Sequence, residues 1–186
     1  MELASAVAEL LKRCGLTMEN IQALGVALGP GSFTSLRVGL ALMKGLAFAR
    51  HLPLIGIPTL DILAAAQASS KLPLAVVIQA GRGRLALSWY KSSKNGWQVA
   101  DPARVTTIDS LLETIKKPVT VCGELTSEER QKLVQKPEVR LASPAQSVRR
   151  PAVLAELAWA RWQKGESDNE ATLAPIYLHV AEPIPA

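Results

Sequence analysis

Residues 28–47 read Leu-Gly-Pro-Gly-Ser-Phe-Thr-Ser-Leu-Arg-Val-Gly-Leu-Ala-Leu-Met-Lys-Gly-Leu-Ala, and this stretch decides the fold of the 186-residue chain. Residues 23–28, which lead into this stretch, form a short apolar run that is typical of a strand buried on both faces. Residues 33–50 then have the spacing of a helix. Because glycine permits unusual backbone angles, the segment predicts a strand, a tight turn and a helix in that order.

The predicted helix at 33–50 is apolar nearly all round. One face carries Leu36, Leu40, Met43 and Ala47, and another carries Val38, Leu42, Leu46 and Ala49. Arg37 and Lys44 leave only a narrow polar stripe. Such a helix cannot face water broadly, so we expect its own sheet on one side and a further element, such as a partner protein, on the other.

The rest of the chain alternates between strand and helix patterns. Apolar spacing predicts a helix at 3–14, and a β-α-β unit follows residue 50. Asn95-Gly96 favours a hairpin, which adds an antiparallel edge to the sheet. The expected class is therefore α/β with a mixed sheet, divided into lobes 1–75 and 76–186. The further predicted strands are 54–57, 74–78, 84–91, 97–99 and 119–122; the further helices are 59–68, 107–116, 126–134 and 151–163, before an extended tail at 175–180.

Composition limits the classes of function. The net charge is +5 and the isoelectric point is about 9.4, which permits contact with nucleic acid, but the basic residues are scattered as on an ordinary solvated surface. Cys14 and Cys122 lie in apolar segments, so we expect two reduced core thiols. No apolar stretch approaches the ~18 residues of a membrane span, and the start has no signal-peptide pattern, so we expect a cytoplasmic protein without a membrane.

The turn itself invites two interpretations. Its free amides and hydroxyls are chemically suited to an anion, yet a simple tight connection is the more common use of such a sequence. Its hydroxyls are better helix caps than nucleophiles, because no base is identifiably placed to activate them. The loop consists of Gly29, Pro30, Gly31, Ser32, Phe33 and Thr34.

The stretch 28–47 closely resembles the diagnostic segment of the TsaB family, also called YeaZ. Residues 52–60 are similar to the strand and helix start that follow in that family, and Pro175-Ile176-Tyr177-Leu178 is similar to its C-terminal motif. The resemblance implies the Gcp-like fold of the acetate kinase, sugar kinase and actin group, with two lobes of mixed sheets flanked by helices.

The same resemblance implies a role and partners. Members of the family are scaffold subunits that bind a TsaD-like catalytic subunit and a TsaE-like ATPase, and that support threonylcarbamoylation of adenosine 37 in tRNAs reading codons that begin with A. ATP and metal are then expected on the partner subunits, with no cofactor on this chain and tRNA contacted through the complex. The first two helices make the contact, and a homodimer is a second use of the same apolar helices. The expected interface residues are Leu3, Val7, Leu10, Leu36, Val38, Leu42 and Met43.

Several departures from the family bear on these expectations. The family opens with an Asp-Thr strand and a hairpin that precede the first helix, so we expect an incomplete N-terminal lobe with an unpaired sheet edge. Ser35 replaces a usual glycine, and Gln79 stands where the family usually has aspartate. The catalytic paralogue carries a His-x-x-x-His metal pair at the positions of Thr59 and Leu63 here, and neither residue can ligate a metal.

Two alternatives stay open at this stage. An ATP-dependent kinase-like or metallopeptidase-like enzyme of the same superfamily is the second hypothesis, although the only histidines, His51 and His179, are far apart in sequence. Arg82 and Arg84 flank a glycine turn and could touch tRNA phosphate or an acidic partner, but a solvated basic turn is the commoner use of two such arginines.

Overall fold

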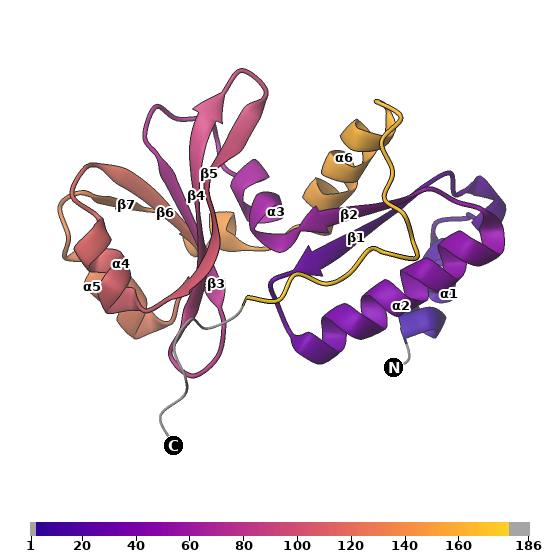
Figure 1. Ribbon diagram of the computed structural model, residues 1–186, viewed down its shortest axis with the longest axis horizontal. Coiled ribbons are helices and arrows are strands. Elements are labelled where there is room, and N and C mark those ends of the chain that lie inside the picture. Colours follow the sequence, from indigo (N-terminus) through magenta and orange to yellow (C-terminus); the bar gives the residue numbers. More distant parts are fainter. Residues whose placement is uncertain (1–2, 179–186) are drawn as a thin grey trace. The chain divides into compact units, whose positions relative to one another are not determined.

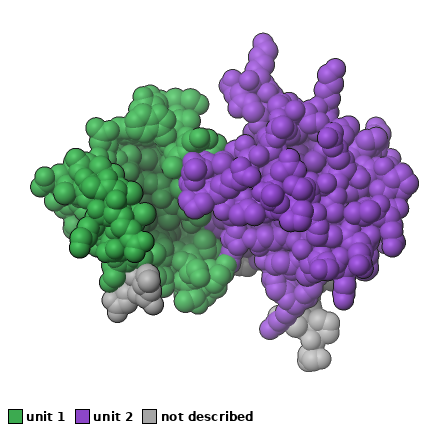
Figure 2. All heavy atoms as spheres, turned by 180° about the vertical axis from the view of Figure 1, so that it is seen from behind, with its two compact units in different colours: residues 1–28, 32–57, 154–175 green, residues 29–31, 58–153, 176–186 purple. Residues whose placement is uncertain are grey.

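The computed structural model describes residues 3–178. The chain forms two compact units, coloured in Figure 2: unit 1 comprises residues 1–28, 32–57 and 154–175, and unit 2 comprises 29–31, 58–153 and 176–186. These units differ from the predicted lobes 1–75 and 76–186. The chain leaves unit 1 after Ile57 and returns at Leu154, because the last helix packs on the first strand rather than on the sheet of unit 2.

Unit 1 is built around a two-stranded sheet of β1 (Leu24–Gly29) and β2 (Leu54–Pro58). Two helices cover it, α2 (Phe33–Arg50) on one face and α6 (Pro151–Trp162) on the other (Figure 1). On the α2 side, the core consists of Val26, Leu40, Ala47 and Leu54. On the α6 side, a Cβ added to Gly25 would lie 2.9 Å from that of Ala158, so glycine permits the close approach. Unit 1 opens with α1 (Leu3–Arg13) and a 3-10 turn, η1 (Met18–Asn20).

A single backbone bridge and a side-chain ion pair occupy the β2 edge of this sheet: the Asp168 N–H donates to the Leu54 carbonyl at 2.8 Å. The backbone N–H of Gly56 donates to Asp168 Oδ2 at 2.7 Å, and Arg161 Nη1 donates to the Gly56 carbonyl at 2.9 Å. Arg161 also binds both carboxylate oxygens of Asp168 at 3.2 Å. The N–H and the carbonyl of Gly56 are thus both hydrogen-bonded by one ion pair, which protects an otherwise open strand edge.

Unit 2 contains a five-stranded mixed sheet with the order β5-β4-β3-β6-β7. Parallel pairs join β3 to β6 and β6 to β7, and antiparallel pairs join β3 to β4 and β4 to β5. The strands are β3 (Leu74–Gln79), β4 (Leu85–Ser93), β5 (Gly96–Thr106), β6 (Val119–Gly123) and β7 (Val139–Leu141). The helices are α3 (Thr59–Ala65), α4 (Ile108–Thr114), α5 (Ser127–Val134) and the 3-10 turn η2 (Pro144–Ser147).

Both faces of the unit 2 sheet are buried. Helix α3 covers one face with Leu60 and Leu63, and α4 and α5 cover the other with Leu111 and Leu133 (Figure 1). Gly123 has a positive φ of 124°, and a Cβ added there would lie 1.8 Å from the Val77 carbonyl oxygen. This strand end is therefore restricted to glycine for steric reasons.

The fold confirms several of the sequence predictions and contradicts one. The mixed α/β class and the hairpin at residues 95–96 are confirmed, and α2 has the predicted bounds of 33–50. The prediction that Cys14 is a core residue is wrong: Cys14 is exposed, whereas Cys122 is buried. Periodicity identified an amphipathic helix, but not whether this chain covers its apolar face. Among residues 3–178, no helix has both the length and the apolar character that a bilayer crossing requires.

Candidate partner-binding surface

Helix α1 is amphipathic but buries none of its side chains. Leu3 and Leu10 of the predicted apolar face are 42% and 61% exposed, and Val7 is half-buried. The opposite face carries Glu9, whose carboxylate accepts a 2.9 Å hydrogen bond from Arg13 across an exposed turn. An apolar stripe on a water-soluble helix normally packs against another element, so the face of α1 is available for further packing.

Helix α2 begins and ends with well-defined caps. The hydroxyl of Ser32 accepts from the Ser35 N–H at 3.5 Å, a long bond, and Ser35 Oγ also donates to it at 3.1 Å. The helix ends at His51, which adopts a left-handed conformation with φ of 52°. Leu40 and Ala47 are the two buried residues of α2, and they pack in the core cluster with Val26 and Leu54 of the sheet.

The outward face of α2 carries a stripe of small and apolar residues. Val38, Ala41, Gly45 and Phe48 are spaced by three, four and three residues, which places them along one side of the helix. Val38 is 51% exposed and Phe48 is 73% exposed, and a Cβ added to Gly45 would meet no atom within 4 Å. The small residues in the centre would let another helix approach closely, with an apolar side chain at each end to pack against it.

The seven predicted interface residues therefore lie in different environments. Leu3, Leu10 and Val38 are exposed, and Val7, Leu36 and Leu42 are half-buried. Met43 is also half-buried and packs partly against the core of its own unit, and its place in a partner surface stays a prediction. The sequence placed apolar residues on two faces of the helix without indicating which face covers the sheet. Phe48 was missed, although its three-residue spacing from Gly45 was a usable signal.

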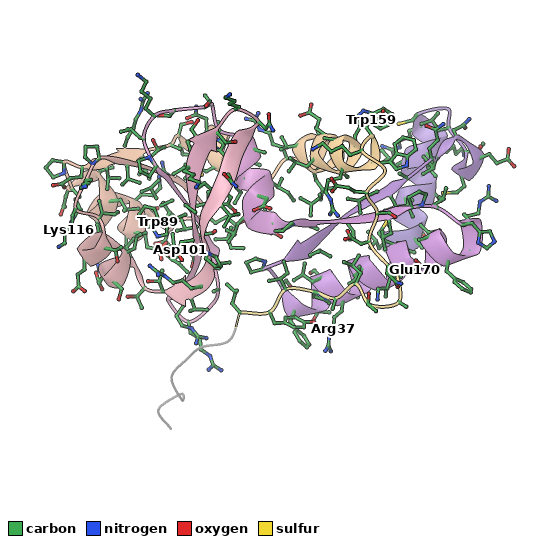
Figure 3. The ribbon with its side chains drawn as sticks, turned by 45° about the horizontal axis from the view of Figure 1, so that its top comes forward. Arg37, Trp89, Asp101, Lys116, Trp159 and Glu170 are labelled. Atoms are coloured by element: carbon green, nitrogen blue, oxygen red, sulfur yellow. The ribbon has the colours of Figure 1, made fainter. Side chains whose placement is uncertain are left out.

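The glycine loop before α2 has the expected capping role. Gly29 has a φ of 102° and precedes a cis peptide bond to Pro30, while Ser32 caps the helix. The guanidinium carbon of Arg37 lies 3.9 Å from the centre of the Phe33 ring, and Figure 3 shows Arg37 projecting from α2 away from the sheet. Gly31 and Thr34 are exposed. The loop thus starts the helix beside a cation–π pair.

The polar side chains inside unit 2 serve packing. Glu129 is buried and accepts from the Thr126 N–H at 2.7 Å and from Gln79 Nε2 at 2.8 Å. Burial raises the pKa of Asp61 above its ordinary value, and a 2.6 Å hydrogen bond from the Tyr90 hydroxyl offsets only part of that rise. Burial also raises the pKa of Tyr90 itself. These contacts tie α3 and α5 to the sheet.

Four positions that the sequence singled out bear on a possible metal site. Thr59 and Leu63 both lie on α3 and are buried, and Leu63 belongs to the apolar core. His51 is exposed at the end of α2, and His179 lies outside the described residues. Across residues 3–178, no group of three or more His, Cys, Asp or Glu side chains is placed to hold a metal ion.

This architecture defines an α/β protein of the Gcp-like type, with a mixed sheet between helices. The chain belongs to the family described as TsaD, tRNA N6-adenosine threonylcarbamoyltransferase, whose family pattern matches residues 1–161. The predicted fold class is confirmed by this match.

Individual relatives refine the comparison. The chain is 29% identical to the tRNA threonylcarbamoyladenosine biosynthesis protein TsaB of Bacillus subtilis, over 95% of this chain and 78% of that protein. A tRNA N6-adenosine threonylcarbamoyltransferase of Clostridium botulinum is 46% identical over 55 residues, which cover 30% of this chain and 16% of the enzyme. The structure of YeaZ from Pseudomonas aeruginosa superposes with a TM-score of 0.74 at 24% identity, over 95% of this chain and 83% of that one. The resemblance to TsaB and YeaZ is confirmed.

Proposed function

We propose that this chain acts in the threonylcarbamoylation of tRNA as a non-catalytic scaffold subunit in the cytoplasm, and that it binds a TsaD-type catalytic partner through unit 1. The binding surface consists of Leu3 and Leu10 on α1 and of Val38, Ala41, Gly45 and Phe48 on α2, and is called the helical surface below. The observation that carries the proposal is the exposure of these apolar residues on two successive helices. A TsaE-type ATPase as a further partner stays a prediction from the family resemblance.

The chemistry of the helical surface indicates what its partner must offer. When another surface covers exposed apolar groups, the free energy falls by about 25 cal/mol for each Å² of apolar area that is buried. Helix α2 also carries Arg37, Lys44 and Arg50 and no acidic residue. We therefore expect the partner to present an apolar helix or groove with acidic residues at its rim, which would select the partner and speed association.

Two observations favour a scaffold over an enzyme. The chain matches the TsaB relative over 95% of its length but the threonylcarbamoyltransferase relative over only 30%. At the positions where the family's catalytic paralogue carries its histidine pair, this chain has Thr59 and Leu63, both buried in helix packing. A buried hydroxyl and a hydrocarbon cannot replace two imidazole ligands.

A pair of charge substitutions tests the proposal. Val38→Glu places a carboxylate within the helical surface, while Val148→Glu places one on unit 2 at a residue of nearly equal exposure, 54% against 51%. Binding of each purified chain to a TsaD-type protein is measured by calorimetry, and threonylcarbamoyladenosine is quantified in tRNA from cells that depend on each variant. We expect Val38→Glu to weaken binding at least about 100-fold, because burying an unpaired charge costs several kcal/mol.

Retained folding is checked by circular dichroism, since both sites are exposed and neither variant should unfold the chain. Val148→Glu is expected to bind within about twofold of the original chain. Undiminished binding and tRNA modification with Val38→Glu would contradict the assigned surface. Robust ATP hydrolysis or metal-dependent peptide cleavage by the isolated chain would instead favour the enzyme hypothesis.

A further inference from the structure

Unit 2 contains a hollow that the proposed scaffold role does not use. Its volume is about 560 Å³, and it lies at the end of the sheet where the parallel strands β3, β6 and β7 begin. Helix α5, the turn η2 and the chain just after α3 also contribute to its lining. Pockets for small molecules have volumes of about 300–1,000 Å³, so this hollow is large enough for an organic ligand.

The register of the sheet places two polar side chains of the hollow next to each other. Leu74 on β3 pairs with Thr120 on β6, and Thr120 pairs with Arg140 on β7. Paired residues of neighbouring strands project from the same face of a sheet, and Leu74 belongs to the core on the α3 face. Thr120 and Arg140 therefore both project on the α3 face, where both line the hollow.

A second arginine reaches the same hollow from helix α5. Arg130 Nη2 donates to the Ala142 carbonyl at 2.9 Å, and Ala142 follows Arg140 by two residues. This bond holds the Arg130 guanidinium at the end of β7 and leaves its other N–H donors for a ligand. Among the described residues, no aspartate or glutamate lines the hollow, and none forms an ion pair with either arginine. The two cations therefore make the hollow attractive to an anion.

Apolar side chains line another part of the hollow. The Trp97 indole N–H donates to the Gln67 carbonyl at 3.1 Å, and the Trp97 ring packs partly against the core, so its position is fixed. Leu141 and Val134 also line the hollow, and Val134 is 67% exposed. An inorganic anion cannot cover these groups, whereas a flat organic ring can stack on an aromatic side chain and bury apolar area. The lining thus matches a ligand that has both an anionic group and a ring.

We propose that this hollow binds a small phosphate monoester that carries a flat ring, of the chemical class of a nucleoside monophosphate. The phosphate binds Arg130 and Arg140, with the Thr120 hydroxyl as a further donor, and the ring lies against Trp97. Two guanidinium groups match the charge of about −1.5 to −2 on a phosphate monoester at pH 7 better than the single charge of a carboxylate. All four residues belong to unit 2, so the inference goes beyond the scaffold role and does not depend on it.

The test follows the N–H signals of the full chain by NMR during titration with AMP. We expect the largest shifts at the Trp97 indole N–H and at the backbone N–H groups of Thr120 and Arg140, and Trp97→Phe assigns the indole signal by its loss. Arg140→Ala should weaken AMP binding at least about tenfold, because it removes a charge-assisted contact from an exposed position. The matched control is Arg82→Ala, which removes the same charge from the turn at the opposite end of β3 and should change the affinity less than about twofold.

Shortened ligands test the contact with the ring. Ribose 5-phosphate and inorganic phosphate keep the anion and lack the base, so each should bind at least about fivefold more weakly than AMP, which is the contribution expected from stacking on one aromatic side chain. Adenosine keeps the base and lacks the phosphate, and it should lose at least as much affinity as Arg140→Ala does.

Three results would overturn the proposal: no shift at the residues of the hollow with about 10 mM AMP, equal losses of affinity in Arg140→Ala and Arg82→Ala, or equal affinity for AMP and inorganic phosphate. The last result would identify a simple anion site without recognition of a ring. The same spectra report whether each variant is folded. Val38→Glu should lose the protein partner and keep its affinity for AMP, so a failure of the scaffold role and a failure of this inference give different results.

Discussion

The two units of this chain bury their side chains to very different extents. In unit 2, a five-stranded sheet is covered on both faces, and β3 is completely inaccessible from Leu74 to Val77. In unit 1, a two-stranded sheet supports a smaller core whose main cluster is Val26, Leu40, Ala47 and Leu54, and α1 contributes no buried residue. Unit 2 therefore has the packing of an independent domain, whereas unit 1 leaves apolar surface for another molecule to cover.

The two units are therefore suited to different tasks. A sheet covered on two faces is close-packed and holds its side chains in fixed positions. A helix pair with exposed apolar residues is suited to association, because its free energy falls when a partner covers it.

The largest expected difference lies in the reactivity of the two cysteines. Cys14 in unit 1 is exposed, whereas Cys122 in unit 2 is buried, and burial raises the pKa of its thiol to about 12. We expect alkylation of the folded chain at pH 8 to modify Cys122 at least about 1,000-fold more slowly than Cys14, because the thiolate is the reactive form and must be reached by the reagent. Mass spectrometry of timed samples measures both rates.

In concentrated denaturant the two cysteines should react at similar rates, which provides the control for intrinsic reactivity. If Cys122 is alkylated in the folded chain at a rate close to that of Cys14, unit 2 opens readily and the contrast between the units is wrong.

Leucine truncations compare the units through stability. Leu111 on α4 is fully buried, and Leu111→Ala should lower the free energy of unfolding by about 2–5 kcal/mol through lost burial and the cavity that remains. Leu10→Ala on α1 should change it by less than about 0.5 kcal/mol, because that side chain is mostly exposed. Urea denaturation measures both values. Similar losses in the two variants would mean that α1 is packed within the chain.

Much of the fold follows from local sequence signals. The bounds of α2 were predictable because a serine cap precedes it and Arg50-His51 closes it before the next apolar run. Strand β7 was missed because three residues carry too little periodicity. Strand β5 is longer than predicted and continues through Pro102, which the edge position of that strand tolerates. A proline in the sequence indicates that a strand is not central, but not that it has ended.

The candidate surfaces were less predictable than the elements that carry them. The sequence shows that α2 is apolar on more than one side, but it does not show which side faces the sheet. Only the structure shows that Met43 packs against the core of its own unit. The ion pair of Arg161 with Asp168 could not be predicted from the sequence either, because both residues bind the backbone of Gly56, more than 100 residues earlier in the chain.

That ion pair gives the smallest of the expected effects, and it tests whether side chains protect the β2 edge. Burial raises the pKa of Asp168, but hydrogen bonds from Arg161 and from the Gly56 N–H outweigh it and lower the pKa below the ordinary value. A lowered pKa in the folded state stabilises the fold above the unfolded value of about 3.9, and this contribution is lost as pH falls through the folded value. Asp168→Asn should therefore lower the free energy of unfolding by about 1–2 kcal/mol at pH 7, and the difference from the original chain should shrink below about pH 4. Glu166→Gln is the matched control, since its half-exposed pair with the same Arg161 should contribute less than about 0.5 kcal/mol. A difference of equal size at pH 7 and pH 3 would show that Asp168 stabilises β2 without its charge.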